Sequence, residues 1–199
     1  MSDDPAPVDP LDALEAEATD PLDIEMVQLM RKVVLRENRR RAQETTDEHG
    51  SPLPRLTLDG PRPPTDDPLL RVGYAMVEHL PPRWEYAILQ IAAAADDVRI
   101  GITVKHETGG PLTFRHLLYL PDVAAASAEL RRSMYEADGR GTWYGAGITL
   151  QQSGAMTTHY DYDNPPFGYW GPNEVTLARR DQELYPRPPE RLPDWHPAR

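Results

Sequence analysis

The segment 141–163, GTWYGAGITLQQSGAMTTHYDYD, contains the clearest β-hairpin pattern in the chain. Its two halves, 142–152 and 155–163, are rich in aromatic and β-branched residues, which favour strands. Between them lies Ser153-Gly154, and glycine favours a tight turn because it adopts positive φ without a steric cost. We therefore predict two antiparallel strands joined by a short turn.

The segments around this hairpin predict the rest of the fold. Strand patterns occupy 83–95, 98–107 and 112–120, and helical periodicity predicts helices at 68–80, 123–138 and 172–186. Asp67 followed by Pro68 is typical of a helix start, and Gly139 is typical of a helix end. The order of these elements predicts an α+β fold, in which an antiparallel β-sheet of about five strands has helices packed on one side.

The composition divides the chain into two parts. Residues 1–65 form a predicted acidic N-terminal extension, and residues 66–199 form the α+β domain. Residues 1–25 carry nine acidic residues and no basic one, and 49–68 reads as a Pro-rich linker. Because few contacts cross such a linker, deleting residues 1–60 is expected to leave a folded domain.

The extension contains a predicted amphipathic helix at 26–45. Its apolar residues recur at helical spacing: Met26, Val27, Met30, Val33 and Val34. Its C-terminal half is basic, with Arg36, Arg39, Arg40 and Arg41. Two interpretations stay open, namely a solvated helix near a chain end and a helix that docks on a partner or on another copy of the chain.

The composition also excludes several functions. Lys and Arg number 21 against 32 Asp and Glu, and a net charge of −11 disfavours direct nucleic-acid binding, which needs a basic face. The absence of cysteine excludes disulfides, thiolate zinc sites and a cysteine nucleophile. No apolar run is long enough to span a membrane, and the acidic N-terminus is unlike a signal peptide, so we expect a cytoplasmic protein.

His159, Asp161 and Asp163 alternate along the last predicted strand and so share one face. Three such side chains span about 13 Å, too far for all of them to bind one metal ion. A metal site would therefore need a further ligand, and His106 and His116 are the candidates. Two interpretations without a metal also stay open. They are a solvated face, with Tyr160 and Tyr162 packed into the core, and an acidic patch that meets a partner.

The loop 165–172, PPFGYWGP, places three aromatic residues among Pro and Gly. Rigid aromatic side chains on a loop are typical of a binding hot spot, although they can also cap the edge of a core. The predicted partner-binding surface comprises Asp161, Asp163, Tyr169 and Trp170, with Glu174 and Asp181 at its rim. Trp195 is expected to anchor the C-terminal tail on the domain. We predict no catalytic residue, metal or cofactor.

Several of these features together resemble the YezG-like family. They are Trp84 after a Pro-rich helix end, the Gly109-Gly110 turn, the hairpin at 141–163 and the segment ELYPRPPERLPDW at 183–195. The resemblance covers about 68–195 and leaves residues 1–65 outside it.

The resemblance implies a single-domain α+β immunity protein, or antitoxin, encoded beside a polymorphic toxin of bacteria. It implies that the protein binds a cognate toxin, a nuclease in many cases, and neutralises it by covering its active site. Two alternatives stay open: a scaffold that oligomerises through its N-terminal helix, and a metal-dependent enzyme that uses His159, Asp161 and Asp163. The sequence leaves the oligomeric state and the identity of the toxin open.

Overall fold

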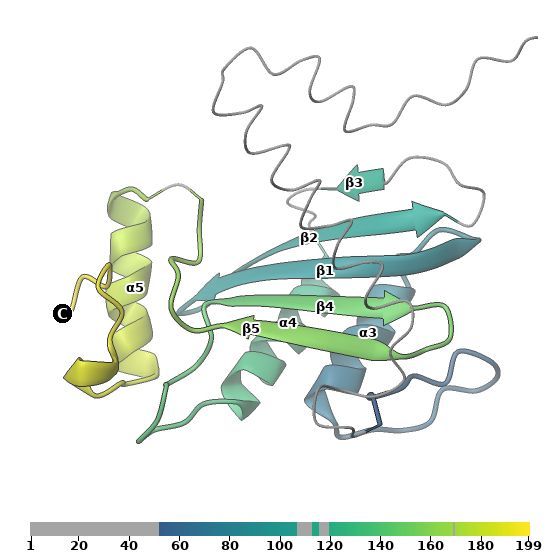
Figure 1. Ribbon diagram of the computed structural model, residues 1–199, viewed down its shortest axis with the longest axis horizontal. Helices are drawn as coiled ribbons and strands as arrows, with labels where there is room; N and C mark the ends of the chain where they lie inside the picture. The colour runs from purple at the N-terminus through teal and green to yellow at the C-terminus, as the bar shows by residue number, and fades with distance from the viewer. Residues whose placement is uncertain (1–51, 107–112, 116–119, 169) are drawn as a thin grey trace, which may run out of the picture.

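The computed structural model describes residues 52–106, 113–115, 120–168 and 170–199 (Figure 1). The helix predicted at 26–45 lies outside these ranges. The elements are α3 (Pro68–Val77), β1 (Trp84–Ala94), β2 (Asp97–His106), β3 (Thr113–Arg115), α4 (Pro121–Ser133), β4 (Gly145–Gln151), β5 (Met156–Asp161), α5 (Pro172–Leu184) and a 3-10 turn at Pro189–Arg191. This order confirms the predicted α+β fold. Within the described ranges, no helix is long and apolar enough to cross a bilayer.

The five strands form one antiparallel sheet in the order β3-β2-β1-β4-β5. The predicted hairpin is the β4–β5 pair, and Gly154 in its turn has a φ of +84°. A Cβ atom at Gly154 would collide with the carbonyl oxygen of Leu56. Glycine is therefore required here for both its backbone conformation and its lack of a side chain.

One face of the sheet forms the hydrophobic core. Leu89 in β1 is in register with Ile102 in β2 and Ile148 in β4, and all three are buried. Helices α3 and α4 lie behind this face (Figure 1) and contribute the buried residues Val72, Met76, Val123 and Leu130. The alternation of buried and exposed positions along β1 and β4 reflects the side-chain period of a strand with one covered face.

Helix α5 lies at the end of the sheet, beside the turn between β1 and β2 (Figure 1). The carboxylate of Asp181 accepts a hydrogen bond of 2.6 Å from the backbone N–H of Ala95 in that turn. The same carboxylate forms an ion pair with Arg131 of α4, with 2.8 Å between Nη2 and Oδ1. Asp181 thus joins α5 to both the sheet and α4.

The core begins earlier in the chain than the sequence indicates. The sequence pattern assigns Leu56 to the linker, yet this residue is 3% exposed and belongs to the core. The backbone of this segment pairs with the start of β5, because Met156 N–H donates to Pro54 and Leu56 N–H donates to Gly154. The boundary predicted at residue 66 therefore lies too far along the chain. Deleting residues 1–60 would remove Leu56, so a deletion that spares this core residue and the Pro54 carbonyl bonded to Met156 has to end before residue 54.

Candidate protein-binding site

The end of β5 has the two-sided pattern that the sequence predicts. His159 and Asp161 are in register with Gly147 and Gly145 on the sheet face away from α3 and α4. Tyr160 points to the other face, where it packs against the core, with its ring centroid 5.9 Å from that of Trp143. The interpretation that Tyr160 packs into the core is confirmed, and His159 remains exposed.

Asp161 closes the turn that follows β5. Its carboxylate accepts hydrogen bonds from the backbone N–H of Asp163 (2.9 Å), the backbone N–H of Asn164 (3.0 Å) and the Asn164 side-chain amide (2.8 Å). Partial burial raises the pKa of Asp161, but these hydrogen bonds outweigh it and hold the pKa below its usual value. Both carboxylate oxygens are therefore engaged within the chain.

This geometry weakens the case for a metal site on β5. His116 lies outside the described ranges, and His106 pairs with Trp84 at one end of the sheet. Asp161 lies at the other end, beside the partner of Ala92. The eight residues of β1 that separate these ends correspond to about 26 Å. Among the described residues, no three His, Asp or Glu side chains gather in a way that could hold an ion.

Trp170 is the exposed aromatic residue of the loop between β5 and α5. It is 36% exposed, and its ring packs edge-on against Trp195 at a centroid distance of 5.1 Å. Trp195 in turn donates from Nε1 to the carbonyl of Asp163 (2.5 Å) and packs against Tyr144 at 4.9 Å. Asp163, Trp170 and Trp195 therefore form one surface, which we call the aromatic corner. Trp195 anchors the tail there, as predicted.

Phe167, from the same loop as Trp170, packs inside the domain and is not part of the exposed surface. It is buried, and the Arg99 guanidinium lies 3.8 Å from the centre of its ring. The two interpretations of the loop thus apply to different residues, because Phe167 caps the end of the sheet while Trp170 faces solvent. Tyr169, the third predicted aromatic contact, lies outside the described residues.

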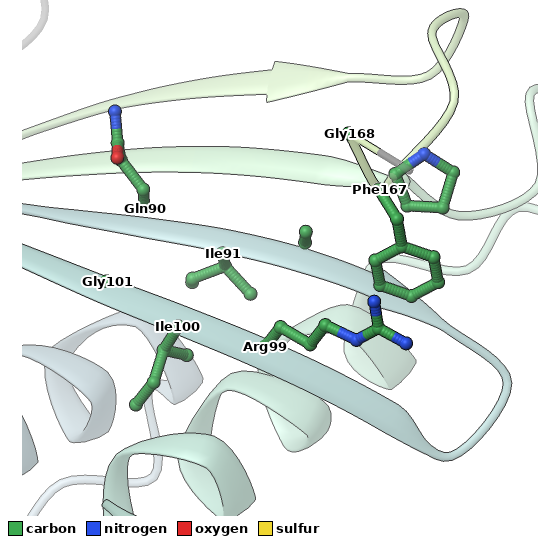
Figure 2. Close-up of a pocket in the computed structure, with 9 residues that line it drawn as sticks. Gln90, Ile91, Arg99, Ile100, Gly101, Phe167 and Gly168 are labelled. Carbon is green, nitrogen blue, oxygen red and sulfur yellow. The ribbon is translucent and has the colours of Figure 1, made fainter. Parts of the chain in front are cut away.

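A shallow pocket of about 430 Å³ separates Phe167 from the strands (Figure 2). Gln90, Arg99 and Gly101 line it from β1 and β2. The positive charge of Arg99 is balanced by carboxylates, since its Nη2 atom lies 2.9 Å from Asp97 and 3.2 Å from Glu174. The pocket can therefore accept an uncharged side chain more readily than an anion.

Glu174 and Asp181 do not form the predicted rim. Glu174 is 7% exposed, and its carboxylate accepts from the N–H of Gly171 at the start of α5. Hydrogen bonding to its own backbone N–H, opposed by desolvation and reinforced by Arg99, lowers the pKa of Glu174. Asp181 is 1% exposed. Both predictions are wrong for the same reason: a helix N-terminus and a buried Arg131 each require an acceptor inside the protein.

Arg187 has a structural role that the sequence analysis does not predict. This residue of the Pro-rich tail is buried and donates hydrogen bonds to the carbonyls of Tyr162 (3.1 Å) and Thr142. Its guanidinium also lies 4.2 Å from the centre of the Tyr144 ring. Arginine in a Pro-rich tail normally indicates a solvated segment. The segment ELYPRPPERLPDW at 183–195 contains both Arg187 and Trp195, and it is the part of the sequence that could have indicated this role. In the structure both residues lie at the same end of the hairpin.

Comparisons with known proteins place the chain in no family. No protein-family model matches the sequence. A search of curated proteins finds no match either. The resemblance to the YezG-like family therefore remains a prediction from the sequence.

Proposed function

We propose that the protein is an immunity protein, or antitoxin, which binds a cognate bacterial toxin and neutralises it by covering the toxin's active site. The observation that carries this proposal is the aromatic corner. Trp170 is exposed, yet Trp195 holds its ring in place. A rigid tryptophan loses little conformational freedom on binding, which is why tryptophan is enriched in interface hot spots.

The resemblance to immunity proteins supports the same surface. Two segments that carry the resemblance meet there: the end of the hairpin, up to Asp163, and the C-terminal tail with Trp195. Trp143 and Gly154 of the hairpin motif have structural roles, since Trp143 is fully buried and Gly154 forms the turn. These buried and turn residues of the motif support the surface structurally, and Asp163 and Trp170 are exposed on it.

The charge of the protein favours a basic partner. The net charge is −11, and Asp163 is exposed beside Trp170. Nuclease active sites bind phosphate through basic residues, so an acidic surface would be attracted to such a cleft and could occupy it. A nuclease toxin is therefore the kind of partner that we propose.

The two alternatives have less support. A metal-dependent enzyme would need Asp161 as a ligand, but its carboxylate closes a turn and His106 lies at the other end of the sheet. A scaffold that oligomerises through 26–45 depends on residues outside the described ranges. The oligomeric state in solution separates this alternative from the proposed function.

The test is co-expression with the product of the adjacent gene, measured by pull-down and by rescue of toxicity. We expect the wild-type protein to bind and protect, and Trp170→Ala to bind and protect poorly. Leu184→Ala is the matched control, because Leu184 is also an exposed large apolar residue, 43% exposed, at the far end of α5. Equal protection by both variants would move the interface away from the aromatic corner. Failure of the wild-type protein to bind any neighbouring gene product would overturn the proposed function.

A further inference from the structure

The sheet has a second face, which the described helices leave uncovered. Helices α3 and α4 lie behind the sheet and α5 lies at its end (Figure 1). By register, the second face carries Ile88, Gln90 and Ala92 of β1, with Thr103 of β2 and Thr149 of β4 on either side of Ile88. A twisted sheet of this size in a small domain is stabilised by apolar cover, so this face is a candidate docking surface.

The shape of this face suits a helix. Gly101 and Gly147 flank Gln90, and Gly145 lies beside Ala92, so a strip of small residues crosses the middle of the sheet. A Cβ atom added at Gly147 would meet open space. Small residues allow a helix backbone to approach a sheet closely, which increases the contact area. The face therefore has a low central strip, with Ile88 and the threonines on one side of it and the exposed side chain of Gln90 within it.

Part of this face, around Ile88, is sheltered from solvent. Thr103 and Thr149 are 5% and 3% exposed, although neither points towards α3 or α4. Burial also raises the pKa of Tyr86, which shares this face through its register with Lys105, to about 12. Gln90, further along β1, is exposed and is the position on this face that is open to contact.

The described part of the chain begins at the edge of this sheet. Arg55 forms an antiparallel bridge with Ala155, and Pro54 and Leu56 bond to Met156 and Gly154, so residues 54–56 lie beside the start of β5. β5 and β1 are separated by β4 alone. A helix that follows this edge has to cross about 10 Å to lie over β1, since neighbouring strands are about 4.8 Å apart.

The length of the N-terminal segment fits as well. The six residues 46–51 span up to about 20 Å when extended, which is enough to cross the edge of the sheet. A helix over 26–45 would be about 30 Å long, and the eleven residues of β1 span about 36 Å. The apolar positions of this segment, spaced at three and four residues, would form one stripe along its first half, 26–34, which is about 13 Å long.

We propose that residues 26–45 dock as an amphipathic helix on the second face of the sheet within the same chain. The apolar stripe at 26–34 contacts Ile88, Ala92 and the strip of small residues, and the basic residues 36–41 lie beyond this stripe, nearer the edge of the sheet. The sheet is then covered on both faces, with α3 and α4 on one side and the N-terminal helix on the other. The aromatic corner remains outside this contact, at the end of the sheet.

The test uses a nitroxide label in the full-length protein, which has no cysteine of its own. The label is placed through His159→Cys, on the edge of the second face, or through Ala125→Cys, an exposed position on α4. We expect the amide signals of 26–34 to broaden strongly with the label at position 159 and to stay sharp with the label at position 125. Equal intensities in the two proteins would overturn the proposal.

Two further measurements sharpen this test. The first distinguishes docking within one chain from contact between two chains, and the second distinguishes docking through the apolar stripe from docking through another side of the helix. In a mixture of labelled and isotope-enriched chains, the signals of 26–34 should stay sharp, because broadening there would mean that a second copy of the chain occupies the face. Met30→Asp places a charge in the apolar stripe and should abolish the broadening. Gln28→Asp adds the same charge on the opposite side of the helix and should preserve it. Broadening that survives Met30→Asp, with the signals of the sheet unchanged, would contradict docking through the apolar stripe.

Discussion

Two regions of this protein are built from the same kinds of residue and have opposite roles. One is the junction of α4, α5 and the sheet, which contains Arg131 and Asp181 and is closed to solvent. The other is the aromatic corner, where Asp163 and Trp170 are exposed. In the junction the two charges pair with each other inside the chain. At the corner the side chains are held in place, but their outer surfaces are open to another molecule.

The energetics of the two regions differ accordingly. A buried carboxylate that pairs with a buried guanidinium costs a great deal when one partner is removed, because the other charge is left without compensation. An exposed carboxylate keeps its water and contributes little to stability. The junction should therefore determine folding, and the corner should determine binding. The following predictions test this contrast, from the largest expected effect to the smallest.

Asp181→Ala should reduce the free energy of unfolding by about 3 to 5 kcal/mol, because it leaves Arg131 buried and unpaired. The other described contacts of Arg131 are a hydrogen bond from Nε to the Trp143 carbonyl and the faces of the Trp143 and Tyr185 rings, and none of these groups carries a negative charge. Asp163→Ala at the corner should change the free energy by less than about 0.5 kcal/mol. Urea denaturation of both variants gives the comparison, and similar losses would contradict it.

Gly154→Ala should destabilise the protein by about 1 to 3 kcal/mol from its φ of +84°. The collision with the carbonyl of Leu56 adds to this cost, because a backbone atom has to move. Gly147→Ala is the control, since its new methyl group meets open space in a strand, and its effect should stay below about 1 kcal/mol. Thermal melting of the two variants measures the difference. Equal melting temperatures would mean that the turn tolerates a side chain.

Trp170→Ala should weaken binding to the cognate toxin by on the order of 2 kcal/mol, mainly through faster dissociation. Its stability should stay near that of the wild-type protein, because the ring is partly exposed and packs chiefly on Trp195. Dissociation rates and melting curves of the same preparation separate the two effects. A large loss of stability with an unchanged dissociation rate would mean that Trp170 supports the fold and does not contact the toxin.

Asp161→Asn should cost on the order of 1 kcal/mol or less at neutral pH, because asparagine keeps an acceptor but loses the charge and the carboxylate is only partly buried. The folded state lowers the pKa of Asp161, so its contribution is complete above the pKa of the unfolded chain, about 3.9. It is lost as the pH falls through the lower, folded-state pKa. The stability difference between wild type and variant should therefore shrink in acid. A difference that grows as the pH falls would contradict this sign.

Much of the fold follows from local patterns in the sequence. The hairpin, the helix starts at Pro68 and Pro172 and the alternation in β5 depend on turn chemistry and side-chain period, which act over a few residues. For this reason the order of elements and the α+β class could be predicted. The exposed position of Trp170 and the anchoring role of Trp195 also followed from residue type and neighbours.

The tertiary structure alone decided which charged residues are internal. Asp181 and Arg187 are charged residues typical of a solvated surface, yet each is buried because its partner comes from a distant part of the chain. Leu56 likewise belongs to the core because its backbone pairs with Gly154 in the β4–β5 turn. The residues around Leu56 in the sequence do not predict this pairing. The physical reason is that a polar or linker residue can be buried only where a complementary group lies next to it in space. The residues adjacent to it in the sequence do not indicate which group that is.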